Sequence, residues 1–261
     1  MMAEYTAVTV ERFDHVARVT MNRPDQLNAF NADLRSDLLK AIREVNEDDS
    51  IRVVILTGAG RAFCAGADLS EQVPAGSRVD DQLNHEYKPA LLGITEASKP
   101  WISAVNGAAA GIGSAFAMAC DLSIMGEKAF LYQAFTAIGL VPDGGSTWLL
   151  ARTVGRKLAY QLMIEGTRIT GDRALELGLV NKVVADDDLQ DAALDWAKTL
   201  AGKSPLSLSC TKEALNAAME CDFGTAISVE ADLQMVCVAS EDAREGAMAF
   251  FERRAPVWKG R

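Results

Sequence analysis

The chain has 261 residues, which is enough for one large domain or for a core with a smaller appendage. Hydrophobic residues make up 49% of it and charged residues 24%, as in ordinary soluble globular proteins, and no apolar run approaches the ~20 residues of a membrane span. Its 26 basic and 36 acidic residues give a net charge of −10, which argues against nucleic acids and anionic membranes as partners.

Cysteine and histidine usage narrows the chemistry further. The five cysteines are an odd number, widely spaced and without a C-x-x-C motif, so we expect reduced thiols rather than disulfides or zinc. The N-terminus shows no basic region followed by an apolar one, and we expect a cytoplasmic protein without a signal peptide. Two histidines, His15 and His85, supply Ser/His or Cys/His catalysis poorly.

The first third of the chain predicts strands around one amphipathic helix. Residues 7–12 and 16–21 alternate in hydrophobicity and form a hairpin, and a turn follows at Pro24. Asn31 is placed to cap the helix after this turn. The expected apolar face of that helix consists of Leu34, Leu38, Ile42 and Val45.

A buried strand at residues 51–57 is followed by glycines that invite a nucleotide-binding interpretation. That interpretation fails, because the third glycine position of the Rossmann pattern holds Phe63. Cys64 has no partner base and is better explained as a small apolar filler. The polar residues 70–86 predict a mobile loop over a substrate, and residues 87–97 a helix.

The segment from Trp101 to Asp121 is the centre of the sequence. Residues 102–105 predict a buried strand, small residues lead to Gly111 and Gly113, and an apolar helix starts near Ser114. A tight turn into a helix leaves backbone N–H groups free to hold an anion or a developing oxyanion. Ordinary close packing explains a lone G-x-G as well.

The remainder changes from mixed strands and helices to helices alone. A strand is expected at 122–125, a partly apolar segment at 130–135, and a last strand at 180–184. Further helices are expected at 146–154, 156–165, 170–177, 187–203, 205–219, 223–239 and 241–254. This order predicts an α/β fold with a core at residues 1–200 and a helical region at 201–261.

Three segments together resemble the crotonase superfamily, the enoyl-CoA hydratase/isomerase family. They are MNRPDQLNAF (21–30), FCAGADL (63–69) and AVNGAAAGIGSAFAMACDL (104–122). GLVPDGGST (139–147) and ALELGLVNKVV (174–184) also fit, so the resemblance covers nearly the whole chain. It implies a spiral core of ββα units, C-terminal helices that build a trimer or hexamer, and chemistry on acyl-CoA thioesters, with coenzyme A as part of the substrate and no separate cofactor.

The resemblance also assigns backbone groups. The family's oxyanion hole uses two N–H donors that fall here at Ala67 and Ile112, where each is worth a few kcal/mol in the transition state (about 3–4). The family usually has glycine at the second position, so the backbone of Ile112 must avoid positive φ.

The expected coenzyme site involves two neighbouring segments. The residues whose backbone resembles the adenine-binding part are Ala65, Gly66, Ala67, Asp68 and Leu69. Arg23 and Leu27 lie in the family's coenzyme-binding turn, although Arg23 is equally well explained as a solvated turn charge.

One acidic residue stands in the catalytic region. The two glutamates of the family's hydratases correspond to Ala115 and Phe135, which removes the parts for hydration. Asp143 follows Pro142 and is placed to cap a helix, worth about 1 kcal/mol. Its position also matches the proton shuttle of the family's enoyl-CoA isomerases and the nucleophilic aspartate of its 4-chlorobenzoyl-CoA dehalogenases. Its surroundings resemble ring-epoxide isomerases of phenylacetyl-CoA degradation.

The sequence thus predicts an acyl-CoA isomerase in which Asp143 moves a proton while Ala67 and Ile112 hold the enolate. The alternatives are an enoyl-CoA hydratase, an aryl-CoA dehalogenase for which His85 is the local histidine, or an acyl-CoA-binding protein without chemistry. The apolar face of residues 206–251 predicts the trimer or hexamer.

Overall fold

The structure is a computed structural model that describes residues 5–72, 76 and 78–261. Its centre is a six-stranded sheet in the order β1-β2-β3-β5-β7-β10. The strands are β1 (Val8–Phe13), β2 (Val16–Met21), β3 (Val53–Gly58), β5 (Trp101–Val105), β7 (Leu122–Gly126) and β10 (Lys182–Val184). β1 and β2 pair antiparallel as predicted, and every later pairing in this sheet is parallel.

A second sheet of four short strands lies beside the first, in the order β4-β6-β8-β9. Its members are β4 (Ala62–Cys64), β6 (Ala108–Ala110), β8 (Phe130–Tyr132) and β9 (Arg168–Thr170). The sequence did not predict β4, β6 and β9, because three residues are too few to show a hydrophobic period. Successive passes of the chain add one strand to each sheet, as in β3–β4, β5–β6 and β7–β8, followed by a helix. The predicted spiral of ββα units is confirmed.

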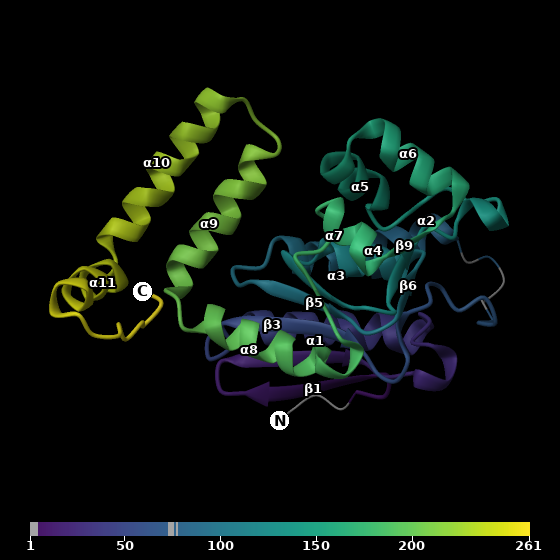
Figure 1. The fold of residues 1–261 in the computed structure, drawn as a ribbon, viewed down its shortest axis with the longest axis horizontal. Helices are drawn as coiled ribbons and strands as arrows, with labels where there is room; N and C mark the ends of the chain where they lie inside the picture. The colour runs from purple at the N-terminus through teal and green to yellow at the C-terminus, as the bar shows by residue number, and fades with distance from the viewer. Residues whose placement is uncertain (1–4, 73–75, 77) are drawn as a thin grey trace.

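Helices cover both faces of the large sheet (Figure 1). On one side, α1 (Ala32–Glu47) begins after Asn31, whose side chain accepts a hydrogen bond from the Leu34 amide at 3.0 Å, and its four predicted apolar residues are buried. α3 (Lys88–Thr95) and α4 (Ile112–Ala119) complete this core. On the other side, α8 (Leu189–Ala201) packs on residues of β2, β3, β5 and β7. Burial on both faces explains the unbroken apolar run of β3.

The remaining helices connect and extend this core. They are α2 (Val79–Gln82), α5 (Ser146–Val154), α6 (Arg156–Glu165), α7 (Gly171–Glu176), α9 (Pro205–Ala218), α10 (Phe223–Ala239) and α11 (Glu241–Glu252). α9, α10 and α11 project away from the sheets (Figure 1), and α10 has no buried residue. None of the helices in the described ranges is both long enough and apolar enough to cross a membrane.

The prediction of a loop over residues 70–86 is wrong for its second half. Residues 79–82 form α2, and a π-helical turn, Leu83–Tyr87, continues directly into α3. The polar composition of this stretch reflects its exposure rather than an absence of helix. Residues 73–75 and 77, which belong to the same prediction, lie outside the described residues.

Candidate active site

The start of α4 carries Ile112, one of the two predicted oxyanion donors. Gly111 precedes the helix with φ 52° and ψ −130°, a combination that favours glycine, and Ile112 is the first helical residue. The positive φ therefore falls on Gly111 and not on Ile112, as the sequence required. Among the described residues, no backbone carbonyl accepts a hydrogen bond from the Ile112 amide, which lies at a helix N-terminus.

Ala67, the other predicted oxyanion donor, lies on the loop after β4. Phe30 forms a parallel bridge with this loop: its amide donates to Gly66 O at 2.8 Å and its carbonyl accepts from the Asp68 amide at 3.0 Å. This pattern directs the N–H of Ala67, between them, to the opposite side of the loop. Within the described ranges, the Ala67 amide has no backbone acceptor, so it is available to a ligand.

Glycines bring the two donor loops together. A Cβ on Gly66, which has φ 102°, would lie 3.0 Å from the carbonyl oxygen of Ala110. A Cβ on Gly113 would lie 2.5 Å from the carbonyl oxygen of Cys64. A side chain at Gly66 would push the loop after β4 away from β6, and one at Gly113 would separate α4 from β4. Cys64 is buried under this contact, where burial raises the pKa of its thiol to about 12, so its role as an apolar filler is confirmed.

The turn that carries Asp143 packs on the same end of α4. A Cβ on Gly144 would lie 2.7 Å from Cδ1 of Ile112 and 2.8 Å from Cβ of Ala115. The prediction that Asp143 caps α5 is wrong, because Gly145 is the N-cap residue and no side chain caps this helix. Gly144 and Gly145, with φ of 61° and 79°, insert a turn between the carboxylate and the helix.

The Asp143 carboxyl group is held in an unusual state. Burial raises its pKa from 3.8 to about 6. Its Oδ1 atom is inaccessible to solvent and has no hydrogen-bond partner among the described residues. A half-buried carboxylate with a perturbed pKa and free acceptor capacity is typical of a general acid or base.

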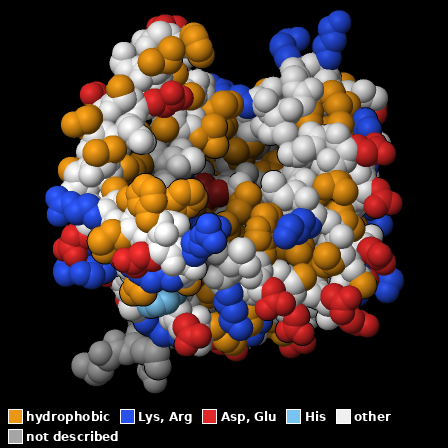
Figure 2. Space-filling model, turned by 60° about the vertical axis from the view of Figure 1, so that its left-hand side comes forward, with side chains coloured by type: hydrophobic (Ala, Val, Ile, Leu, Met, Phe, Trp, Pro, Cys, Tyr) orange, Lys and Arg blue, Asp and Glu red, His pale blue; other side chains and the backbone are white. Residues whose placement is uncertain are grey.

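Asp143 lines a pocket of about 570 Å³ between the core and the C-terminal helices. Figure 2 shows a hollow bordered by hydrophobic side chains on the face where these helices come forward. The deeper walls are mainly apolar or aromatic: Leu83, Tyr87, Leu91, Trp148 and Leu149. Glu220 also lines the pocket, but it pairs with Arg152 at 2.8 Å.

Unpartnered buried polar atoms gather around this pocket. Within the described part of the chain, the atoms of this kind are Tyr87 Oη, Gln133 Oε1, Asp143 Oδ1 and Ser146 Oγ. Tyr87 and Asp143 line the pocket, Ser146 begins α5 beside it, and Gln133 contacts α4. Since buried polar groups are normally satisfied, these atoms support the site predicted at Asp143 and add Tyr87 and Ser146, which the sequence did not reveal.

The positions of the hydratase glutamates belong to this site but are apolar. Ala115 is fully buried under Gly144, and the Phe135 ring would be 3.8 Å from a Cβ on Gly111. His85 is not brought into the pocket: its side chain is 77% exposed and faces Asp81 at 4.0 Å. The site thus lacks the histidine considered for a dehalogenase.

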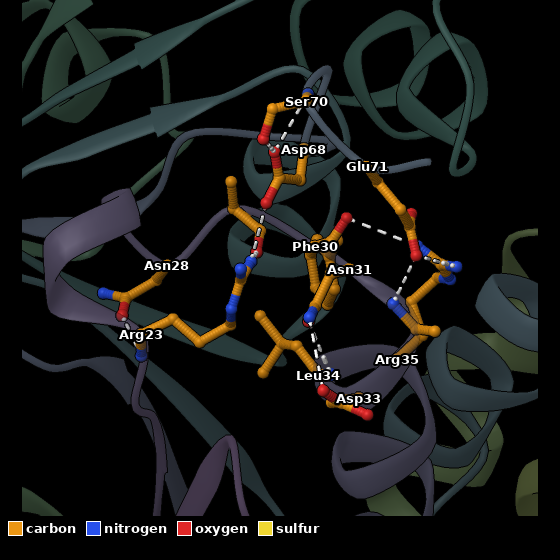
Figure 3. A network of polar contacts seen from close by, with 12 residues as sticks. Arg23, Asn28, Phe30, Asn31, Asp33, Leu34, Arg35, Asp68, Ser70 and Glu71 are labelled. Carbon is orange, nitrogen blue, oxygen red and sulfur yellow. Dashed lines mark hydrogen bonds and ion pairs between the residues drawn. The ribbon is translucent and has the colours of Figure 1, made fainter. Parts of the chain in front are cut away.

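The predicted coenzyme-binding turn is joined to the loop after β4, which carries Ala67 and Asp68. The Arg23 guanidinium bonds the Asp68 carboxylate at 3.0 Å and also donates to the carbonyl of Ala29 (Figure 3). The alternative of a solvated turn charge is wrong, because both side chains of the pair are more than four-fifths buried. Hydrogen bonds from Ser70 and Arg23 hold the pKa of Asp68 below its usual value despite partial burial.

Two further features place the rest of this segment. Leu27 adopts φ 51° and its carbonyl accepts a bond from the Ala65 amide at 3.0 Å, while Leu69 leaves 79% of its surface exposed. Glu71 joins the Ala32 amide at the start of α1 to Arg35, another contact in Figure 3 that local sequence did not predict. The structure therefore brings every proposed coenzyme-binding residue onto two connected turns.

Solved structures of known proteins share this arrangement of two sheets and flanking helices. The sequence model of the family described as Enoyl-CoA hydratase/isomerase matches residues 11–261, and the chain belongs to that family of enzymes.

Relatives of different activity are similarly distant. The chain is 38% identical over 264 residues to 1,2-epoxyphenylacetyl-CoA isomerase of Escherichia coli (strain K12), covering 100% of both. It is 36% identical over 257 residues to a probable enoyl-CoA hydratase of Rhodobacter capsulatus, covering 98% of this chain and 99% of that one. The crystal structure of an enoyl-CoA hydratase from Bacillus anthracis superposes with a TM-score of 0.91 at 33% identity, covering 98% and 100%.

Proposed function

We propose that this enzyme is an acyl-CoA isomerase with Asp143 as its proton shuttle. The observation that carries the proposal is the half-buried Asp143 carboxylate, with a pKa of about 6 and an Oδ1 atom that has no partner among the described residues. It precedes Gly144, which packs against Ile112 at the start of α4. A base whose pKa lies near the working pH is suited to removing a proton from carbon and returning it.

The proposed reaction needs one carboxylate and two amides. Asp143 takes a proton from a carbon made acidic by conjugation with the thioester, and the electron pair moves to the thioester oxygen. The amides of Ala67 and Ile112 hold the enolate oxygen. The protonated Asp143 then returns the proton to another carbon, so a double bond or ring bond shifts while the composition of the substrate stays unchanged.

The walls of the pocket support an apolar or cyclic acyl group. Tyr87 and Trp148 provide aromatic surface, and the E. coli relative is named for a phenylacetyl-CoA epoxide. The coenzyme portion of the thioester is assigned to the turn at Arg23 and Leu27 and to the backbone of residues 65–69. No separate cofactor is required by this chemistry.

The C-terminal helices are proposed to assemble the enzyme. Residues 201–261 form the assembly region and residues 1–200 the acyl-CoA-binding core. The most exposed aromatic side chains of the region are Phe223, Phe250 and Phe251, each at least 80% exposed. Such surface is typical of a subunit interface, and we propose a homotrimer or a pair of trimers.

Hydration is the second candidate, because several relatives are named hydratases. Ala115 and Phe135 provide no carboxylate to activate water, which favours isomerisation.

The test is a screen of 2-enoyl, 3-enoyl and aryl-substituted thioesters in deuterated water, followed by NMR. We expect movement of a double bond or ring bond and exchange of carbon-bound protons. Efficient addition of water to crotonyl-CoA without any isomerisation would refute the proposal.

A further inference from the structure

The peptide unit between Gly111 and Ile112 has two functional ends. Its N–H is the proposed oxyanion donor, and its carbonyl oxygen points back into the first turn of α4. That oxygen accepts hydrogen bonds from the Ser114 amide at 3.0 Å and from the Ser114 hydroxyl at 2.7 Å. The carbonyl is therefore bonded twice by one residue that does not line the pocket.

The Ser114 hydroxyl is itself part of a longer chain. Its oxygen accepts a hydrogen bond from Nε2 of Gln133 at 2.8 Å, which leaves its proton directed to the Gly111 carbonyl. Gln133 follows β8, and the preceding residue, Tyr132, accepts a bond from the Gly111 amide at 2.9 Å. One end of β8 thus holds both sides of Gly111.

Burying the polar side chains of Ser114 and Gln133 costs desolvation free energy, and packing alone does not explain why they are there. Ser114 is 0% exposed and Gln133 is 1% exposed, and Oε1 of Gln133 has no partner among the described residues. An apolar side chain at 133 would avoid the desolvation of that oxygen. Other hydroxyls also bond a carbonyl of their own helix, as Thr153 does, but Ser114 additionally accepts a bond from a buried amide of another element.

We propose that Ser114 and Gln133 are positioning residues that orient and polarise the Ile112 oxyanion donor. The inference rests on the oxyanion role given to Ile112 under the proposed function. Hydrogen bonds to a peptide carbonyl withdraw electron density and make the N–H of the same peptide a stronger donor, by about 10–30% per bond in a low-dielectric interior. They also fix the plane of the peptide before substrate arrives, which is the basis of electrostatic preorganisation.

The experiment measures the polarisation of a bound carbonyl. Cinnamoyl-CoA with ¹³C at the thioester carbonyl has no γ-proton to move, so it reports binding without isomerisation. We expect the carbonyl stretch and the ultraviolet absorbance of the wild-type complex to shift relative to free thioester. Ser114→Ala and Gln133→Met should each reduce the contribution of the Ile112 donor to that shift by about 10–30%, and the double variant no more than Ser114→Ala, because both act through one chain of hydrogen bonds.

Kinetics on the best isomerisation substrate supply a second readout. A loss of 10–30% of one donor's contribution lowers kcat about two- to eightfold, with KM nearly unchanged. Ser103→Ala is the matched control, since its equally buried hydroxyl donates to Ser123 Oγ at 2.8 Å in the large sheet. It should lower thermal stability and leave the carbonyl shift at the wild-type value.

The outcomes separate the two proposals. A carbonyl shift unchanged in both Ser114→Ala and Gln133→Met, or reduced equally by Ser103→Ala, overturns the inference. If Ser114→Ala does not fold, Gln133→Met alone decides, because it leaves the serine in place. Absence of any shift in wild-type protein overturns the oxyanion role and the inference with it. An Asp143 variant with full activity overturns the proton shuttle alone.

Discussion

Replacing Asp143 by asparagine separates the two consequences that burial has for this carboxylate. The substitution keeps the size of the side chain and removes its charge and basicity. Loss of a general base is expected to lower kcat by about 10²–10⁴. Affinity for the thioester should change little, because the proposed coenzyme contacts come from the turns at 23–27 and 65–69.

The thermal stability of the Asp143→Asn variant is expected to rise while its activity falls. The difference between a pKa of 3.8 and one of about 6 corresponds to about 3 kcal/mol for a fully enclosed group. Because Asp143 borders an open pocket, solvent screening reduces this to about 1–2 kcal/mol. The ionised carboxylate therefore destabilises the fold, and asparagine should raise the melting temperature at pH 8 by about 2–8 °C.

The sign of the pH dependence follows from the raised pKa. Well below pH 3.8 the carboxyl group is neutral in the folded and unfolded states, and the two proteins should be equally stable. The destabilising contribution develops as pH rises from about 4 to about 6 and is complete above that. The activity of the wild-type enzyme, which needs the ionised base, should rise over the upper part of the same range.

The assay combines turnover of the best thioester, thioester affinity by calorimetry, and melting temperature at pH 4, 6 and 8, all at one protein concentration. Asp195→Asn, an exposed carboxylate on α8, is the matched control and should change neither rate nor stability appreciably. An Asp143→Asn protein with wild-type kcat would refute the assignment of the base. A variant less stable at pH 8 than wild type would refute the account of its burial.

Three other predictions concern packing, assembly and the coenzyme turn. Ala115→Glu should destabilise the enzyme by about 3–5 kcal/mol in denaturant without creating hydratase activity, because Gly144 leaves no room for the carboxylate. Phe251→Asp, at a site 82% exposed in the single chain, should convert the proposed trimer to monomers in light scattering; monomeric wild-type protein at micromolar concentration would exclude that trimer. Arg23→Ala should raise KM more than it lowers kcat, and a double-mutant cycle with Asp68→Ala should give a coupling of about 1–3 kcal/mol; additive effects would argue against a stabilising Arg23–Asp68 pair.

Regular elements with a repeating hydrophobic pattern could be predicted from the sequence. β3 reads as a continuous apolar run because Val53 and Ile55 face α8 while Val54 and Leu56 face the other core. The cap of α1 was predictable because Asn31 bonds an amide only three residues away. In both cases the deciding interactions are local or periodic.

Elements defined by distant pairing could not be predicted in this way. The three alanines of β6 have no strand pattern of their own, and they extend because they pair with β4 and β8. Local sequence favoured a capping role for Asp143 and the resemblance a catalytic one, since positive φ at Gly144 is not visible in local composition. The resemblance predicts a catalytic role for Asp143, but only the structure shows that the turn carrying it packs on α4 and that its Oδ1 atom has no partner among the described residues.

The packing of Gly144 bears on both candidate reactions of this enzyme, the addition of water and the transfer of a proton. Its Cα lies so close to α4 that a Cβ would meet Cβ of Ala115 at 2.8 Å. A glutamate side chain at 115 would meet the turn that carries Asp143, so this turn occupies the space that a carboxylate at 115 would need. The small residues Gly144 and Ala115 together allow the turn of Asp143 to pack beside Ile112, the proposed oxyanion donor. The same packing thus supports the turn of Asp143 and leaves no room at 115 for the glutamate that the resemblance assigns to the family's hydratases.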